Sequence, residues 1–134
     1  MRKFVKTAVI ILGHGSKNSR SGDPLRQVAG EVKKHGLYDI VEYAFLQHCD
    51  PTPQNAIETC VRKNAAQIVI VPFFMQPGAH VARDIPALVE KAQKQFASVK
   101  IIVTDYAGAH PLMTKIVMDL IATSISGTAT ISER

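Results

Sequence analysis

The sequence predicts an α/β fold: a four-stranded parallel sheet with helices on both faces, formed by a βα unit repeated four times. Four short apolar runs rich in β-branched residues alternate with four stretches in which apolar residues recur at helical spacing. The first, third and fourth runs are almost continuously apolar, which is typical of strands buried on both faces in parallel sheets. Right-handed crossovers then connect the strands.

The predicted strands and helices alternate along the chain. The strands are expected at Thr7–Leu12, Ile40–Leu46, Gln67–Phe74 and Val99–Tyr106. Four sets of apolar residues carry the helical spacing: Leu25, Val28, Ala29 and Val32; Ile57, Cys60 and Val61; Ile85, Leu88, Val89, Ala92 and Phe96; and Leu112, Ile116, Leu120 and Ile121.

Capping residues predict where the first two helices begin. Asp23 is expected to cap the first helix, with Pro24 in its first turn and Gly36 at its end. Thr52 is expected to cap the second helix, and Pro53 follows it. Both helices therefore have a defined start in the sequence.

The third helix has two possible starts. Asp84 can cap a helix that begins at Ile85, with Pro86 in the first turn. Alternatively, a turn of helix begins near His80, in which case His80 and Asp84 lie on one face because they are four residues apart. The fourth helix is expected to open at His110-Pro111.

Length and composition indicate a single domain. The chain has 134 residues, of which 46% are hydrophobic, enough for one core without disulfides or a structural metal. We expect this domain over residues 1–125 and a polar, frayed tail over residues 126–134.

The same composition predicts a cytoplasmic protein that does not associate with membranes. The N-terminal residues are interpreted as the first strand rather than a signal peptide, and no apolar run reaches the roughly 18 residues of a membrane span. Two cysteines, Cys49 and Cys60, make no disulfide framework and are expected to be free thiols.

The net charge of +5 is spread along the chain rather than clustered. Such a modest excess suits a polyanionic small molecule. Nucleic-acid binding needs a basic stripe or aromatic stacking residues, and this chain has 6% aromatic residues and no Trp. We therefore expect no nucleic-acid partner.

Four of the five histidines follow predicted strands: His14, His48, His80 and His110. The carboxyl ends of parallel strands meet at one edge of a sheet, where α/β folds bind ligands near the switch in strand order. The fifth, His35, lies at the end of the first helix, where a cation is favourable. The distribution therefore predicts a ligand site at the carboxyl edge.

His14 and His80 are the main candidates at this edge. Gly13 and Gly15 flank His14 and let a ligand approach the backbone closely, although His14 can also serve as a cap or bond a loop carbonyl. His80 also follows a glycine, and Asp84 can orient its ring as well as cap a helix.

Two further histidines are weaker candidates. His48 lies at the rim and can face solvent, and His110 suits the start of a helix before Pro111. The cysteine beside His48, Cys49, can bind metal but is expected to be an ordinary thiol.

Two imidazoles with a carboxylate nearby favour a borderline divalent metal such as Co, Ni, Fe or Zn. The sequence has no CxxC or HExxH motif, so a closed structural zinc site is not expected. An open site with few protein ligands suits a metal in transit. Two alternatives stay open. Ser16, Ser19 and backbone N–H groups before the first helix can form a phosphate cradle. His14 can also serve in phosphoryl transfer, although Gly13 stands where an arginine usually precedes such a histidine.

Four segments occur in a recognisable order: GHGSK after the first strand, AFLQHCDPTPQNAI after the second, VPFFMQPGAHVARDIP after the third and GAHPLM after the fourth. With them the chain resembles the short class II tetrapyrrole chelatases, the family of sirohydrochlorin cobalto-, nickelo- and ferrochelatases. The resemblance covers Val9 to about Ile125. It implies a class II chelatase-like half domain.

The resemblance also implies roles for individual residues. His14 would be a metal ligand and proton acceptor, and His80 the second metal ligand. The residues expected to contact the tetrapyrrole are Asp50, Met75, Gln76, Pro77, Gly78, Ala79 and His80. Weaker candidates at the site or behind it are Ser16, Gln47, His48 and Asp84.

Two positions depart from the family's usual pattern. Gln47 stands at or near a position where the family often has Glu, so one candidate ligand or proton carrier is lost. Lys17 replaces the usual arginine after HGS, which keeps the charge but loses a bidentate fork. Lys17, Arg20 and Arg83 are candidate contacts for the carboxylates of a tetrapyrrole. These departures leave the metal preference open.

The implied reaction inserts a divalent metal into sirohydrochlorin and releases two protons, in cobalamin- or sirohaem-type tetrapyrrole biosynthesis. Co²⁺ is favoured, with Ni²⁺ and Fe²⁺ as alternatives, and the metal is a substrate with no tightly bound cofactor. Because the tetrapyrrole disc is large beside one small domain, a homodimer that encloses it is expected. Two alternatives remain: a metal or tetrapyrrole carrier without turnover, and a phosphoryl-transfer enzyme using His14.

Overall fold

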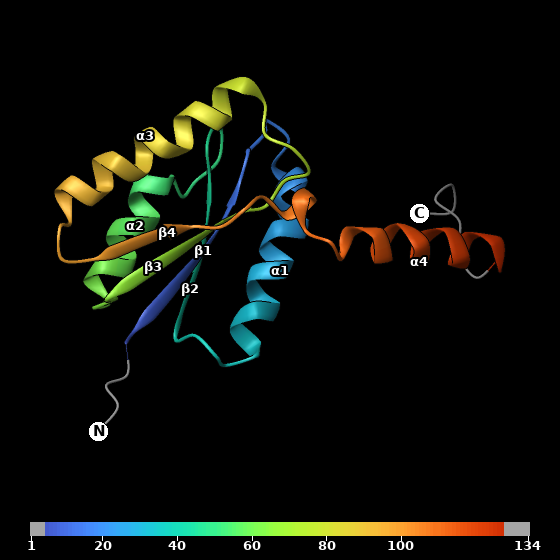
Figure 1. Cartoon of the computed structure of the whole chain (residues 1–134), viewed down its shortest axis with the longest axis horizontal. Coiled ribbons are helices and arrows are strands. Elements are labelled where there is room, and N and C mark those ends of the chain that lie inside the picture. Colours follow the sequence, from blue (N-terminus) through green and yellow to red (C-terminus); the bar gives the residue numbers. More distant parts are fainter. Residues whose placement is uncertain (1–4, 128–134) are drawn as a thin grey trace.

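The computed structural model describes residues 5–127, which form a four-stranded sheet in the order β2-β1-β3-β4 (Figure 1). All three neighbouring pairs are parallel. The strands are β1 (Thr7–Gly13), β2 (Ile40–Phe45), β3 (Gln67–Pro72) and β4 (Lys100–Val103). The last strand ends at Val103, before the predicted Tyr106, and a 3₁₀ helix follows at Ala107–Ala109.

Helices lie on both faces of this sheet, which confirms the predicted fold class (Figure 1). One face is covered by α1, and the other by α2 and α3. The helices are α1 (Asp23–Lys34), α2 (Pro53–Arg62), α3 (Ala79–Gln95) and α4 (Met113–Ile125), with 3₁₀ helices η1 (Ser19–Gly22) and η2 (Ala107–Ala109).

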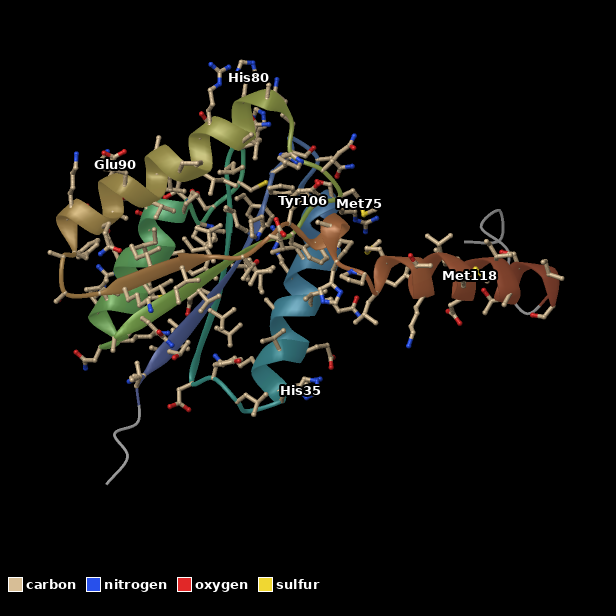
Figure 2. All side chains as sticks on the ribbon, in the orientation of Figure 1. His35, Met75, His80, Glu90, Tyr106 and Met118 are labelled. Carbon is tan, nitrogen blue, oxygen red and sulfur yellow. The ribbon has the colours of Figure 1, made fainter. Side chains whose placement is uncertain are left out.

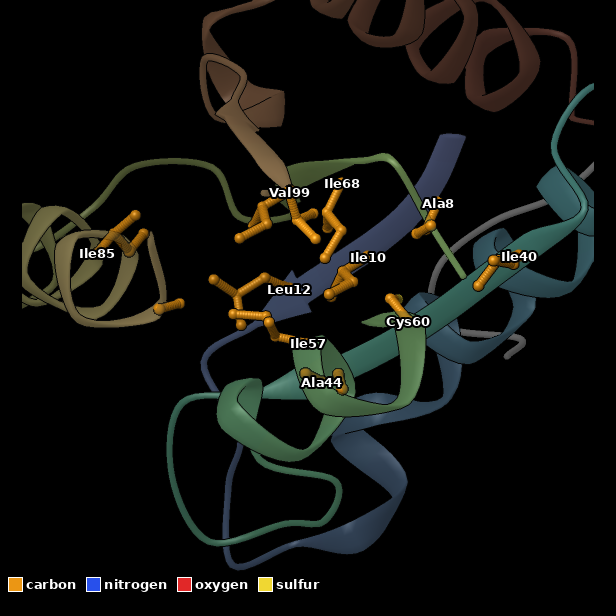
Figure 3. Packing of buried hydrophobic residues seen from close by; sticks show 14 residues of the cluster. Ala8, Ile10, Leu12, Ile40, Ala44, Ile57, Cys60, Ile68, Ile85 and Val99 are labelled. Carbon is orange, nitrogen blue, oxygen red and sulfur yellow. The ribbon is translucent and has the colours of Figure 1, made fainter. Parts of the chain in front are cut away.

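The alternation of side chains in β1 produces two apolar clusters. Ile10 and Leu12 point toward α2 and α3, where they pack with Ile57 and Ile68 (Figure 3). The intervening β1 side chains point the other way and pack with Leu25 and other residues of α1. The near-continuous apolar run of β1 is thus explained, since both of its faces are buried.

The N-cap of α2 is the residue predicted from the sequence, but the N-cap of α1 is not. The Thr52 side chain accepts a hydrogen bond from the backbone N–H of Asn55, as predicted. Gly22, not Asp23, is the N-cap of α1, and Asp23 is the first helical residue. The Asp23 carboxylate instead lies 3.2 Å from Arg26 Nη1, one turn further on.

The third helix begins at Ala79, so the prediction of a helix that starts at Ile85 with Asp84 as its cap is wrong. Gly78 is extended and precedes the first turn, and Ala82 N donates to Gly78 O at 3.0 Å. Pro86 therefore lies inside the helix rather than in its first turn.

The fourth helix projects away from the sheet and from the other helices (Figure 1). None of its residues, all within the described range, is buried. The predicted polar tail, residues 126–134, lies outside the described residues from residue 128 onward. Among the helices of the described residues, none has the length and apolarity needed to cross a membrane.

Candidate functional site

The strand order places the ligand edge between β1 and β3. From β1 the chain passes through α1 to β2 on one side, and from β2 it crosses back through α2 to β3 on the other. In such sheets ligands bind beyond the carboxyl ends of the two strands where the order switches. His14 follows β1 directly, and the segment after β3 leads to His80.

The loops after β1 and β2 are joined by their backbones. Leu46 N donates to Gly13 O at 2.9 Å, and Gln47 N donates to His14 O at 3.0 Å. Gly15 has a φ of +84°, and a Cβ at this position would overlap the carbonyl oxygen of Gln47. A glycine is therefore required after His14 for packing between loops, independently of any ligand.

The loops after β3 and β4 are joined in a similar way. Gly108 N donates to Phe74 O at 3.1 Å. A Cβ on Gly108 would overlap the backbone carbonyl of Met75. The backbone at the start of the Met75–His80 segment is therefore held against η2.

A ring contact connects these two pairs of loops. The centroid of the His14 imidazole lies 4.4 Å from that of the Phe74 ring, with the planes tilted by 35°. His14 is half-buried and lines a hollow of about 290 Å³. The other lining residues are Gly13, Gly15, Ser16, Ser21, Gly22, Pro24, Leu25, Phe45 and Phe73. The structure thus restrains the imidazole at the mouth of a small cavity.

His80 lies on the first turn of α3 and is exposed (Figure 2). Asp84 is also exposed and lies one turn further along the same helix, as expected if the helix begins near His80. Within residues 5–127, no hydrogen bond, ion pair or ring contact links His80 to Asp84 or to His14.

The structure brings His14 and His80 to one edge but not into contact. Among the described residues, no group of three His, Cys, Asp or Glu side chains is arranged to hold a metal ion.

The remaining predicted contact residues form an open rim. Asp50, Met75, Gln76, Gly78 and Ala79 are exposed, and Pro77 is partly exposed. The peptide bond between Asp50 and Pro51 is cis. A large flat ligand can reach these residues from solvent without entering a deep pocket.

Among the weaker candidates, two have structural partners in the loops. Ser16 Oγ accepts a hydrogen bond from Asn18 N at 3.1 Å, and the carbonyl oxygen of Gln47 accepts one from Cys49 N at 2.8 Å. The side chains of Gln47 and His48 are exposed, and His48 has a φ of +65°. Cys49 Sγ donates to Ser16 O at 3.1 Å, so this thiol links the same loops.

The other two histidines have roles that the sequence indicated. His110 Nδ1 accepts a hydrogen bond from Leu112 N at 3.1 Å, just before α4. His35 is exposed at the C-cap of α1, far from His80 (Figure 2). The fourth helix begins at Met113, later than the predicted start at His110-Pro111, and His110 holds the turn before it.

Sequence reasoning missed Phe73, Phe74 and Gly108, which support the site. Phe73 and Phe74 were assigned to the third strand, but β3 ends at Pro72 and both rings lie beyond it. Phe73 lines the His14 hollow and Phe74 contacts the His14 ring. The only signal in the sequence was an aromatic pair between an apolar strand and a Pro-Gly loop.

The comparison with protein families gives one match across most of the chain. The family described as CbiX matches residues 8–124. The sirohydrochlorin ferrochelatase of Arabidopsis thaliana, described as chloroplastic, is 34% identical over 118 residues, 88% of this chain and 52% of that protein. The sirohydrochlorin cobaltochelatase of Methanopyrus kandleri is 36% identical over 81 residues, 60% of this chain and 57% of that protein. The chain thus spans between half and three-fifths of the length of these relatives.

Solved structures have the same fold. The sirohydrochlorin chelatase SirB from Bacillus subtilis subspecies spizizenii, in complex with cobalt, has a TM-score of 0.79 and 26% identity, covering 88% of this chain and 50% of that chain. A putative cobalamin biosynthesis CbiX protein from Marinobacter aquaeolei VT8 also has a TM-score of 0.79, at 20% identity, covering 90% of this chain and 98% of that chain. Because the family match extends over residues 8–124 of 134, the chain belongs to the CbiX family.

Proposed function

We propose that this chain inserts a divalent metal into sirohydrochlorin and releases two protons. The observation that carries the proposal is the position of His14 and the segment leading to His80 after β1 and β3, the two strands at the switch in strand order. The relatives named as sirohydrochlorin ferrochelatase and cobaltochelatase support the same substrate. Co²⁺ is our favoured metal, with Ni²⁺ and Fe²⁺ as alternatives.

In this proposal both His14 and His80 bind the metal, and His14 also accepts a proton. The metal is a substrate, and no resident cofactor takes part. A neutral imidazole binds Co²⁺, Ni²⁺ or Fe²⁺ and can also accept a proton near neutral pH. His14, restrained by Phe74, binds the metal and accepts a ring proton, and His80 is the second ligand. A site with few ligands releases the metal readily, which insertion requires.

In this proposal the macrocycle lies outside the hollow beside His14, whose small volume supports that placement. A hollow of about 290 Å³ is at the lower limit of pockets that enclose small ligands, roughly 300–1,000 Å³. We expect the tetrapyrrole to contact the exposed residues Asp50 and Met75–His80 instead. Sirohydrochlorin is a polycarboxylate, and Lys17, Arg20 and Arg83 are exposed cations, the first two between β1 and α1 and the third in α3.

One open rim leaves the other face of the disc in solvent, so the proposal includes a homodimer. It also includes a cytoplasmic location, as expected from the sequence.

A turnover assay tests the proposed function against a carrier role. Purified protein is mixed at catalytic concentration with sirohydrochlorin and, in separate reactions, Co²⁺, Ni²⁺ or Fe²⁺, and the absorbance change on metallation is followed. Many product molecules per protein molecule, above the rate without protein, are expected for at least one metal. Binding of metal or tetrapyrrole without turnover would instead support a carrier, for which the exposed Gln47 in place of Glu is the motivating feature.

A further inference from the structure

Within residues 5–127, no hydrogen bond or ion pair to the protein orients the imidazole of His14. Histidines that bind metals usually hold the ion through one ring nitrogen and donate a hydrogen bond from the other to a carboxylate, a carbonyl or water. That second bond fixes the plane of the ring. In this chain, the plane of the His14 ring must be fixed by a different kind of contact.

The ring of Phe74 supplies that contact. The two ring centroids are 4.4 Å apart and the planes are tilted by 35°, close to the short end of the roughly 4.5–7 Å range of aromatic pairs. At this distance and tilt the rings meet largely through their faces. Both imidazole nitrogens carry their lone pair or proton in the plane of the ring. The contact with Phe74 therefore restrains His14 without occupying either nitrogen.

The backbone around Phe74 is held on two sides. Phe73 N donates to Leu12 O at the end of β1 at 2.7 Å, and Gly108 N donates to Phe74 O at 3.1 Å. The Phe74 side chain thus starts from a fixed backbone position. A residue that orients a ligand must itself be held in place by its surroundings, and Phe74 meets this requirement.

The same ring lies beside the helix that carries His80. Phe74 and Val81 both pack against the apolar cluster on the side of the sheet covered by α2 and α3. Together with Pro77, they line a small hollow of about 180 Å³ at the first turns of α3. Because Val81 follows His80 directly, Phe74 is adjacent to both segments that carry the candidate metal ligands.

We propose that Phe74 is a positioning residue for metal binding at this edge. Its ring fixes the plane of the His14 imidazole, and its packing beside Val81 fixes how far the start of α3 lies from His14. Phe74 offers no ligand atom, so it acts only through the two histidines. This role rests on the proposed function, in which His14 and His80 are ligands of one ion.

The joint action of two histidines depends on their relative placement. Once one imidazole holds the ion, the second adds affinity according to its effective concentration at that ion. If Phe74 sets this concentration, removal of its ring leaves His80 less able to reach the ion bound by His14. The effects of changing Phe74 and His80 on metal affinity should then not add, although no direct contact joins the two side chains in the described residues.

Phe96 provides a matched control for the loss of an aromatic ring. Like Phe74, it is a partly buried phenylalanine packed against the same apolar cluster. It is the C-cap of α3, at the opposite end of that helix from His80. Phe74→Leu and Phe96→Leu therefore remove similar packing, and only the first removes the contact with His14. Phe74→Met is a second variant without a ring, and its flexible side chain fills more of the space.

Binding of Co²⁺ alone, measured by isothermal titration calorimetry, tests this role without turnover. Phe74→Leu and Phe74→Met should lower the Co²⁺ affinity about 10-fold or more, as expected when the partner that orients a metal-binding histidine is removed. Phe96→Leu should bind Co²⁺ as tightly as wild type. Phe74→Tyr, which keeps the ring, should retain the wild-type affinity. Circular dichroism checks that each variant has the α/β signature.

A double-mutant cycle separates positioning from a general structural defect. His80→Ala is made in wild type and in the Phe74→Leu, Phe74→Met and Phe96→Leu backgrounds. In wild type and in Phe96→Leu it should lower the Co²⁺ affinity by the same factor. In the two backgrounds without the Phe74 ring the factor should be clearly smaller, because His80 no longer acts together with His14.

Equal Co²⁺ affinities of the Phe74 variants and Phe96→Leu, or an equal effect of His80→Ala in every background, would overturn the positioning role of Phe74. Those results would leave His14 and His80 as ligands. If wild type binds no Co²⁺, or if neither His14→Ala nor His80→Ala weakens its binding, the assignment of the two ligands in the proposed function is wrong, and the role of Phe74 is overturned with it.

Discussion

Gly15 holds the loop of His14 against the loop of the neighbouring strand. Its φ of +84° is unfavourable for residues with a Cβ, and a Cβ would overlap the Gln47 carbonyl. Because Gln47 N donates to His14 O, a shift of this loop would also displace the backbone of His14. At the residue scale, Gly15 is therefore a positioning residue.

Replacement of Gly15 by alanine should destabilise the fold by about 2–4 kcal/mol, because it adds backbone strain and a steric overlap. Urea unfolding measures the change. Gly30→Ala is the matched control: Gly30 lies inside α1, and an added Cβ meets no atom within 4 Å. This control should stabilise the fold by about 0.5–1 kcal/mol. Equal stability of Gly15→Ala and wild type would show that the loops do not constrain each other.

The two thiols should differ in reactivity. Burial raises the pKa of the Cys60 thiol to about 12, and the nearby Glu42 carboxylate adds to this rise. The thiolate is the reactive form, so iodoacetamide at pH 8 should alkylate the partly exposed Cys49 and spare Cys60. Peptide mass spectrometry measures the alkylation of each cysteine. As a control, both cysteines should be alkylated in denaturant. Labelling of Cys60 in the native protein would contradict its burial.

The raised pKa of Cys60 also determines how stability changes with pH. Between its ordinary value of 9.0 and about 12, the unfolded thiol loses its proton while the folded thiol keeps it. The free energy of unfolding should therefore fall as pH rises through this range, by up to about 1.4 kcal/mol per pH unit. Cys60→Ala lacks this contribution, so the difference in unfolding free energy between the two proteins should narrow from pH 8 to pH 10.5. A difference in unfolding free energy that stays constant from pH 8 to pH 10.5 would contradict the raised pKa of Cys60.

At the scale of the element, α3 shows how a cap signal can mislead. Asp84 followed by Pro86 matches the pattern of a helix start, yet the helix begins at Ala79. The preceding segment is anchored at Met75 by Gly108, and Gly78 then enters the helix in an extended conformation. Of the two starts that the sequence allowed, the one near His80 agrees with the structure, so the cap pattern at Asp84 alone did not decide between them.

The internal proline of α3 should lower the free energy of unfolding by a measurable amount. Pro86 cannot donate a hydrogen bond to the carbonyl one turn earlier, so Pro86→Ala should raise the free energy of unfolding by about 1–2 kcal/mol. Pro24→Ala, in the first turn of α1, is the control and should change stability by no more than about 0.5 kcal/mol. Chemical denaturation measures the free energy of unfolding of both variants. A Pro86→Ala protein less stable than wild type would contradict the expected increase.

At the scale of the whole molecule, the sequence predicted the parallel sheet and the edge that carries His14, His48, His80 and His110. Both features follow from the spacing of apolar residues along the chain. Strands that alternate with helices run parallel, so their carboxyl ends meet at one edge. The ring contact of His14 with Phe74 and the direction of α4 could not be predicted. The apolar periodicity of Leu112, Ile116, Leu120 and Ile121 predicts a helix face packed against the sheet, yet no residue of α4 is buried in the described part of the chain.

The central claim is that His14 and His80 carry metal insertion at the carboxyl edge of the sheet. The most direct test is the steady-state rate of Co²⁺ insertion into sirohydrochlorin by wild type, His14→Ala, His80→Ala and the double variant, with His35→Ala as control. His14→Ala should lower the rate roughly 100-fold or more, as expected for loss of a ligand and proton acceptor. His80→Ala should also lower it, while His35→Ala, at the far end of α1, should leave it unchanged. A double variant that inserts metal at the wild-type rate would contradict the account.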